Sequence, residues 1–102
     1  MFHALQLELE DNVATVVVDV AKNATLTVQT PGATTTITAV EPIAFGHKIA
    51  LQSLQKGDIV TKYGRPIGRA TTNITRGGYV GVHNIEGMRG RGDLATSQGG
   101  AQ

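Results

Sequence analysis

The 102-residue sequence contains no cysteine and no tryptophan, and it has only two phenylalanines and two tyrosines. Without cysteine the chain has neither a disulfide nor thiolate chemistry, which fits a reducing compartment such as the cytoplasm. With so few aromatic side chains, the core of a single domain of this length must consist of Val, Ile, Leu and Ala. We therefore expect a small cytoplasmic protein with a modest aliphatic core.

Long apolar runs and a strong net charge are also missing. No apolar stretch approaches the roughly 20 residues of a membrane span, and the N-terminus lacks the basic start of a secretory leader. The net charge is +1, which is too small by itself to indicate nucleic acid. We expect binding to neither membranes nor nucleic acid.

The charge is nevertheless unevenly distributed. Residues 1–60 contain three basic and six acidic residues, a balance of −3, whereas residues 61–102 contain six basic and two acidic residues, a balance of +4. The basic half either faces an anion or is an ordinary uneven surface.

Short strand patterns fill most of the chain. Residues 5–9 alternate leucine with polar residues, which predicts a strand with one buried face. Residues 13–18 are a β-branched run typical of a fully buried strand. The Thr-rich residues 25–38, interrupted by a Pro-Gly pair, predict a hairpin. Only residues 51–55 have a helical pattern, and they are too few for more than one turn.

One spacing recurs three times along the chain. An apolar residue is followed by Gly or Asn three positions later and by another apolar residue three positions after that. The three sets are Val20, Asn23 and Leu26; Leu54, Gly57 and Val60; and Ile74, Gly77 and Val80. Gly and Asn tolerate a positive φ at the lowest cost, so each set predicts a turn between strands. Repeated turns of this kind predict a mainly β, compact, folded-over structure of short strands with at most short helical turns.

The segment "AFGHKIAL", residues 44–51, places His47 and Lys48 side by side in an apolar run. A histidine here can act as a general acid or base or as a metal ligand, with the lysine holding an anionic group. The alternative is a surface turn whose polar pair has no chemical role.

A second histidine occurs in "VGVHN", residues 80–84. Alternation places Val80 and Val82 on one face and Gly81 with His83 on the other, so His83 points away from the packed face. The glycine leaves open space beside it. This arrangement suits a ligand site, and it equally suits a solvated strand end.

Two further segments have candidate binding features. "KYGRPIGRA", residues 62–70, combines two glycines with three cations and can cradle a carboxylate or phosphate, although the same residues are typical of a hairpin turn, which we favour. Residues 87–102 are Gly-rich and polar, so we expect a flexible tail after a domain of residues 1–86. The tail's "RGRGD" is too short and lacks the aromatics of a nucleic-acid element.

Five motifs together carry a resemblance to a known family. In chain order they are "DNVA" (11–14), "GHKIAL" (46–51), "KGDIVTKYGRPIGRAT" (56–71), "VGVHN" (80–84) and "RGRGDL" (89–94). They resemble the N-terminal domain of the altronate/galactarate dehydratases. In some members this region is a separate small subunit, as in the sulfolactate sulfo-lyases. The Thr-rich residues 22–39 match least well.

The resemblance implies an SAF-type β-clip fold and a lyase activity. The expected reaction eliminates water, or sulfite, from a sugar acid or related 2-hydroxy acid. As a separate small subunit, the chain would complete the active site of a large catalytic subunit and be inactive alone. A divalent metal, expected to be iron, would be held mainly by that large subunit, and no metal ligand is assigned here. A homo-oligomer is compatible with this organisation.

The resemblance also implies roles for individual residues. His47 and His83 are the expected catalytic pair. The expected substrate-binding residues are Lys48, Asp11, Asn12, Tyr63, Arg65 and Asn84. Family members often have His-x-His-Asn where this chain has Gly81-Val82-His83-Asn84, so the role of the first histidine is missing here or is filled elsewhere.

A different class of function remains open from the sequence. SAF-type domains also serve as non-catalytic β-clip modules that bind a sugar or another protein. A large-subunit gene beside this one would favour the lyase, and its absence would favour the module.

Overall fold

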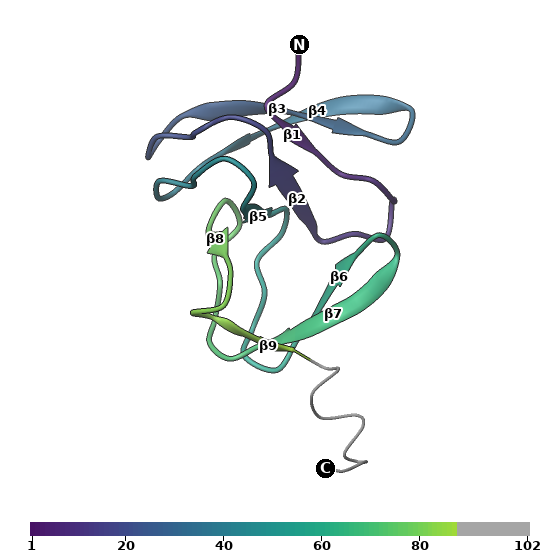
Figure 1. Cartoon of the computed structure of the whole chain (residues 1–102), viewed down its shortest axis with the longest axis vertical. Coiled ribbons are helices and arrows are strands. Elements are labelled where there is room, and N and C mark those ends of the chain that lie inside the picture. The colour runs from purple at the N-terminus through teal and green to yellow at the C-terminus, as the bar shows by residue number, and fades with distance from the viewer. Residues whose placement is uncertain (88–102) are drawn as a thin grey trace.

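The computed structural model describes residues 1–87. This part of the chain contains nine strands and no helix, so nothing in it is a helix long and apolar enough to cross a membrane (Figure 1). The strands are β1 (Ala4–Leu5), β2 (Val13–Val16), β3 (Thr25–Thr30), β4 (Ala33–Thr38), β5 (Lys48–Ala50), β6 (Ile59–Lys62), β7 (Arg65–Ala70), β8 (Tyr79–Val80) and β9 (Ile85–Gly87). The mainly β fold class is confirmed.

The strands form two sheets. One has the order β4-β3-β1-β2-β5-β8, and the other has the order β6-β7-β9. Neighbouring strands are antiparallel except for β1 and β3, which are parallel. The β3–β4 hairpin lies at one end of the molecule and the β6–β7 hairpin lies toward the other, with β2 and β5 between them (Figure 1).

Four turns of one kind reverse the chain between these strands. Each is a four-residue turn whose third residue has a positive φ. These residues are Asn23 (71°), Gly46 (88°), Gly57 (96°) and Gly77 (88°). Three of these turns are the ones that the spacing predicts. The fourth, at Ile43, Gly46 and Ile49, has the same spacing, and it is the turn in which His47 and Lys48 lie.

Each turn is held to a buried residue on another segment by two backbone hydrogen bonds. In the first bond, the amide of the positive-φ residue donates to the carbonyl of the buried residue. In the second bond, the amide of that buried residue donates to the carbonyl of the residue that follows the positive-φ residue. The pairs are Asn23 with Ala39, Gly46 with Val16, Gly57 with Ala70, and Gly77 with Ala50. The turns also associate two by two through the bridges Val20–Ile43 and Leu54–Ile74. Because every turn is tied to a remote segment, the short strands are held in one compact arrangement.

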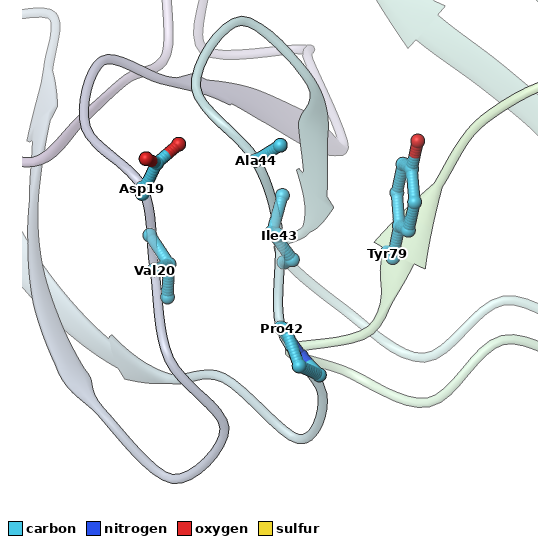
Figure 2. A pocket seen from close by; sticks show the side chains of 6 residues that line it. All are labelled: Asp19, Val20, Pro42, Ile43, Ala44 and Tyr79. Carbon is cyan, nitrogen blue, oxygen red and sulfur yellow. The ribbon is translucent and has the colours of Figure 1, made fainter.

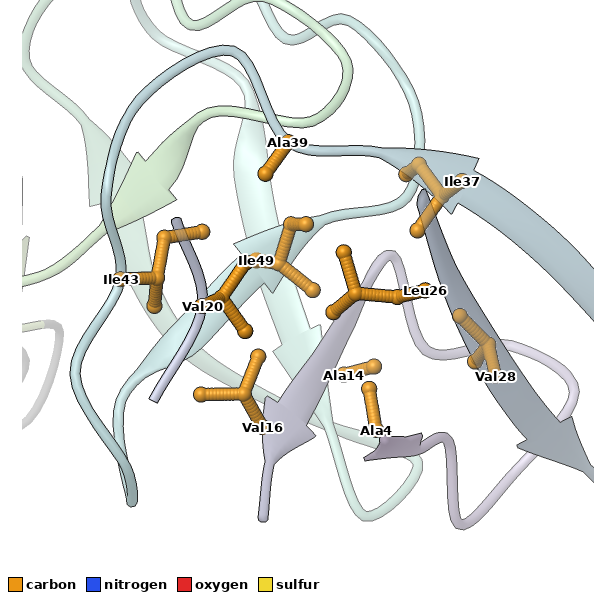
Figure 3. Close-up of a cluster of buried hydrophobic side chains, with 10 residues drawn as sticks. All are labelled: Ala4, Ala14, Val16, Val20, Leu26, Val28, Ile37, Ala39, Ile43 and Ile49. Carbon is orange, nitrogen blue, oxygen red and sulfur yellow. The ribbon is translucent and has the colours of Figure 1, made fainter. Parts of the chain in front are cut away.

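The hydrophobic core lies on both faces of β2 and β5. Residues that alternate along these two strands enter different clusters, as the period of two in a strand requires. The first cluster, drawn in Figure 3, contains Ala4, Ala14, Val16, Val20, Leu26, Val28, Ile37, Ala39, Ile43 and Ile49. The second contains Val13, Ala50, Leu54, Val60, Ala70, Ile74 and Val80. All of these side chains are aliphatic, as the scarcity of aromatic residues predicts.

Some predicted strand boundaries are confirmed and others are wrong. The Thr-rich hairpin is β3–β4, with Gly32 at a positive φ in its turn. The strand predicted over 5–9 ends at Leu5, and Leu9 is 72% exposed. The reason is a turn in which the Asp11 amide donates to the Glu8 carbonyl while an Asp11 side-chain oxygen accepts from the Glu8 amide. The buried run predicted over 13–18 likewise ends at Val16.

The domain boundary between residues 86 and 87 stays a prediction. Gly87, the expected first residue of the tail, is the last residue of β9 and pairs with Gly68. Residues 88–102, which make up the rest of the expected tail, lie outside the described residues.

Two glycines in equivalent turn positions provide a test of this description. Alanine at Gly57 would meet no neighbouring atom, so Gly57→Ala should lower the free energy of unfolding only by the cost of the left-handed conformation, about 1–2 kcal/mol. A Cβ at Gly77 would overlap the Thr38 carbonyl oxygen. Gly77→Ala should therefore cost more, about 3–5 kcal/mol.

Chemical denaturation of both variants measures the difference. Gly87→Ala serves as the control because a Cβ there has no neighbour within 4 Å and no positive φ is required. Equal losses at Gly57 and Gly77 would contradict the packing described for the second turn.

Candidate functional site

His47 follows directly after the positive φ of Gly46 and is exposed. The turn itself holds the residue, because the His47 amide donates to the Ala44 carbonyl and ring atom Nδ1 lies 3.2 Å from the same oxygen. The imidazole meets the ring of Tyr79 edge-on, with 5.2 Å between the ring centroids. Tyr79 comes from β8, which pairs with β5, so tertiary structure and not sequence proximity creates this contact.

His83 contacts the same tyrosine from another direction. Its ring is tilted against Tyr79 with 4.8 Å between centroids, and its side chain is exposed. Asn84 shapes the turn that presents it, since its Oδ1 accepts from the Gly81 amide at 2.9 Å and its Nδ2 donates to the Tyr79 carbonyl at 2.7 Å. The buried Asn84 side chain thus stabilises the turn formed by residues 81–84.

The structure therefore brings the two candidate histidines together around one aromatic ring. The sequence pattern did not reveal Tyr79, although two signals for it exist. It is one of only four aromatic residues in the chain, and it occupies the sixth position of the turn set that starts at Ile74. We call His47, Tyr79 and His83 the aromatic cluster.

Tyr79 also bears on the missing histidine at position 81. A Cβ built on Gly81 would lie 3.1 Å from Cε1 of Tyr79 and 3.4 Å from Nδ1 of His83. The tyrosine ring therefore occupies space that a larger residue at position 81 would need. The glycine at position 81 and the tyrosine at position 79 fit together in this chain.

A pocket of about 430 Å³ adjoins the aromatic cluster through Tyr79. Its wall is mainly aliphatic, with the Asp19 carboxylate at one side and the tyrosine at the other (Figure 2). The lining residues are Asp19, Val20, Pro42, Ile43, Ala44 and Tyr79. One Asp19 oxygen accepts from the Phe45 amide at 2.9 Å, which fixes the carboxylate at this rim. The pocket combines an apolar floor with two polar groups, as small-molecule sites commonly do.

Lys48 lies on the other face of β5. It pairs with Val80 of the second core cluster, whereas its neighbour Ile49 pairs with Tyr79 and belongs to the first. Adjacent residues of a strand point to opposite faces, so His47 and Lys48 do not emerge together. Burial lowers the pKa of the Lys48 ammonium, the charge of Lys62 lowers it further, and Tyr63 raises it. Lys48 is therefore close enough to Lys62 and Tyr63 of the β6–β7 hairpin to interact with them electrostatically.

Asp11 and Asn12 hold that hairpin against the start of β2. The buried Asp11 carboxylate accepts from the amides of Tyr63 and Gly64 at 3.0 and 2.8 Å. Asn12 accepts from the Thr61 amide and donates to the Ile59 carbonyl. These bonds give both residues a role in the fold, and contact with a substrate stays a prediction for them.

Tyr63 and Arg65 occupy the tip of the hairpin, and both are exposed. Tyr63 and Gly64 have φ values of 58° and 71°, the left-handed pair that a two-residue hairpin turn requires. The segment 62–70 is thus a hairpin, as we favoured, and it still presents its cations to solvent.

The described residues do not form a self-contained metal site. Within 1–87, no three His, Asp or Glu side chains are grouped closely enough to hold a metal ion. The aromatic cluster by itself offers two imidazoles. We therefore derive no chemical step through a metal on this chain.

Comparison with known proteins assigns the fold to a family. The model of the altronate/galactarate dehydratase SAF domain matches residues 2–88. The chain belongs to this family. The resemblance to this family is thereby confirmed, and four of the five motifs lie within the matched residues, whereas "RGRGDL" at 89–94 lies beyond them.

Similar proteins include altronate dehydratases and sulfo-lyase subunits. Altronate dehydratase of Escherichia coli K12 is 38% identical over 80 residues, which are 78% of this chain and 15% of that protein. Altronate dehydratase of Bacillus subtilis 168 is 48% identical over 46 residues, 45% of this chain and 9% of that protein. The alpha subunit of (2R)-sulfolactate sulfo-lyase of Paracoccus pantotrophus is 42% identical over 53 residues, 52% of this chain and 79% of that subunit.

These relatives differ in how much of their own length the match covers. The SAF chain is homologous to lyases, yet it spans only 15% and 9% of the two altronate dehydratases. It covers most of the sulfo-lyase alpha subunit, a protein whose name identifies it as one subunit of an enzyme. The roles of individual residues are not assigned by these matches.

The structural role of the Asp11 side chain in this SAF domain can be tested by replacing it with alanine. Asp11→Ala leaves the amides of Glu8, Tyr63 and Gly64 without their acceptor, and it should lower the free energy of unfolding by about 2–4 kcal/mol. Asp58→Ala is a matched control, because its exposed carboxylate accepts only from the Gln55 amide among the bonds described. Thermal denaturation measures both, and a loss at Asp11 no larger than that at Asp58 would contradict the assignment.

The lowered pKa of Lys48 predicts a pH-dependent stability. Between the folded and the unfolded pKa the unfolded chain binds more protons, so stability rises as pH increases through that range. Lys48→Met removes the half-buried ammonium and should stabilise the domain at neutral pH. The advantage should shrink as the pH rises toward the ordinary lysine pKa of 10.5, because Lys48 of the folded protein loses its proton below that value.

Denaturation midpoints at both pH values measure this difference. Lys22→Met, at an exposed turn position, provides the control and should show little change at either pH. A stabilisation by Lys48→Met that does not depend on pH would contradict the electrostatic explanation.

Proposed function

We propose that this chain is the small subunit of a lyase that eliminates water, or sulfite, from a sugar acid or a related 2-hydroxy acid. The observation that carries the proposal is the convergence of His47 and His83 on the ring of Tyr79, beside the pocket lined by Asp19 and Ile43. Both histidines are exposed on a domain that belongs to a dehydratase family. A large catalytic subunit would cover this edge and complete the site.

The chemistry of elimination suits an imidazole at such an edge. A base removes the proton α to the carboxylate, and the β-hydroxyl departs with its bonding electrons. A protonated histidine can deliver the proton that converts this hydroxyl to water, whereas sulfite leaves as a stable anion. Histidine changes charge near neutral pH, so it can hold and release a proton under cellular conditions. We assign the acid role to His47, with His83 as the second candidate.

The packing around Tyr79 explains how the two imidazoles would be positioned. Edge-on and tilted contacts with one ring restrict both side chains without using their nitrogen atoms as structural hydrogen-bond partners, apart from the His47 Nδ1 contact with Ala44. Such contacts are worth about 0.5–1.5 kcal/mol each, enough to favour one orientation. The Nε2 atom of His47 makes none of the hydrogen bonds described for residues 1–87 and can face a substrate.

The relatives support division of the enzyme between two chains. The P. pantotrophus relative is an alpha subunit of which the match covers 79%, whereas the match covers only 15% of the E. coli relative. The divalent metal that the resemblance implies has no three-residue ligand group within the described residues. We therefore place the metal, and most of the catalytic groups, on the large subunit.

Reconstitution with a co-expressed neighbouring large subunit tests the proposal. Altronate, galactarate and sulfolactate are the substrates to assay, and the isolated chain should turn over none of them. In the reconstituted enzyme His47→Gln should lower kcat about 10²–10⁴-fold, the usual contribution of a general acid or base. Glutamine keeps hydrogen-bonding capacity and similar size, so the affinity between the subunits should remain near that of wild type.

Two further variants make the result specific. His83→Gln tests the second histidine, and we expect a smaller loss than at His47. His3→Gln is the control, because Nδ1 of His3 accepts from the Thr27 amide and glutamine can accept in its place. Full activity of the His47→Gln enzyme with native subunit affinity would refute the acid role, and activity without any partner would refute the two-subunit assignment. Absence of turnover with any large subunit would favour a non-catalytic binding module.

A further inference from the structure

The tip of the β6–β7 hairpin gathers cations in an arrangement that is unfavourable for the free protein. Lys62 and Arg65 are directly opposite each other across the two-residue turn of Tyr63 and Gly64. Like charges in directly opposite strand positions repel each other and destabilise a hairpin. An anion between them would remove this repulsion.

The side chains at the tip also form a defined hollow. The Lys62 ammonium lies 4.6 Å from the centroid of the Tyr63 ring, and this cation–π contact restricts its position. A pocket of about 380 Å³ lies beside it, lined by Lys62, Tyr63, Arg65, Pro66 and Ile67. Two cations, a phenol and two apolar walls therefore surround one space large enough for a small acid.

Lys48 adds a third positive charge from β5. Its ammonium is close enough to Lys62 and Tyr63 for their charges to act on its pKa, and no carboxylate is among the groups that do so. A partly buried ammonium that faces another ammonium is costly without an anionic partner. Lys48 thus adds positive charge near Lys62, one of the two cations that line the pocket.

The neighbouring acidic groups occupy the other side of the turn. The Asp11 carboxylate already accepts hydrogen bonds from the Tyr63 and Gly64 amides. Glu8 and Glu10 lie next to Gly64, where a built Cβ would be 3.5 Å from Cγ of Glu8 and 3.9 Å from Oε2 of Glu10. The turn's backbone amides are therefore not open to a ligand, and recognition must come from the side chains.

We propose that the pocket at the β6–β7 hairpin binds a small oxyanion, a carboxylate or sulfonate, between Lys62 and Arg65. Tyr63 and Ile67 contact the carbon skeleton of the ligand, and the Lys48 ammonium adds to the positive charge near Lys62. None of the residues that line this pocket belongs to the aromatic cluster, so the two sites are separate. The proposal does not depend on the lyase assignment, because it concerns binding by this chain alone.

The bound oxyanion has two possible sources, a free small acid and an acidic side chain of a partner subunit. Both present the same group to the same cations. The full 102-residue chain can be titrated with sodium malonate and with sodium sulfate at constant ionic strength, set with sodium chloride to control for screening. Amide chemical shifts from nitrogen-15 NMR report where each anion binds.

Binding at the proposed site predicts saturable shifts confined to the hairpin. Tyr63, Gly64 and Ile67 should shift together with one dissociation constant. Lys62→Gln and Arg65→Gln should each raise that constant about tenfold, because each removes a charge-assisted hydrogen bond. Glu10→Gln should lower it, since it removes a competing negative charge beside the turn. Arg65 and Glu10 are exposed and Lys62 is half-buried at the hairpin tip, so the variants should keep the fold, which their unperturbed spectra verify.

Matched controls decide whether the site is specific. Lys22→Gln and Lys56→Gln remove exposed charges from two other turns and should leave the dissociation constant unchanged. Non-saturable shifts, or equal losses in the control and hairpin variants, would overturn the proposal. In the presence of the large subunit, retained malonate binding identifies a free acid as the ligand. Loss of malonate binding together with weaker subunit association in Lys62→Gln identifies the partner's carboxylate.

Discussion

The positive-φ turn is the constraint on which the rest of this structure depends. In each of four turns, at Asn23, Gly46, Gly57 and Gly77, a left-handed residue allows the chain to reverse within four residues. The reversal exposes one amide and one carbonyl, and both bind to a single buried residue of another segment. A local backbone requirement thus becomes a long-range connection. Because the turns also associate in pairs, a chain with short strands and few aromatic side chains can hold a compact aliphatic core.

The same constraint distributes the polar groups of the site. The turn at Gly46 leads into β5, a strand that lies between the two core clusters. His47, just before β5, contacts Tyr79, whereas Lys48, the first residue of β5, has its pKa lowered by burial and by the nearby charge of Lys62. Two neighbouring residues in the sequence therefore serve two different surfaces. One surface has imidazoles beside an aliphatic pocket, and the other has cations around a hollow.

The polar residues of the chain differ in how much of their bonding capacity the fold uses. Asp11, Asn12 and Asn84 direct their side chains to backbone amides and carbonyls, which shapes the two loops that carry the exposed groups. His83 and Arg65 remain exposed at those loops, and His47 is exposed at the Gly46 turn. This division suits a domain of the dehydratase family that supplies a few groups to a site completed elsewhere. The inner polar residues set the loop geometry, and the outer ones are free to meet a ligand or a partner.

The sequence by itself determined the elements that depend on local conformation. Periodicity and Pro-Gly chemistry predicted the β3–β4 hairpin, the spacing of Gly and Asn predicted three of the four turns, and combined motifs predicted the family. The strand predicted from the alternating leucines at residues 5–9 was wrong beyond Leu5, because the hydrogen bonds between Asp11 and Glu8 form a turn there. Only the tertiary structure decided that Tyr79 joins His47 to His83 and that Lys48 belongs with Lys62. Those contacts depend on the register between β5 and β8 and on the docking of a hairpin against β2. Register is set by which buried side chains pack together across the whole domain, and no local pattern contains that information.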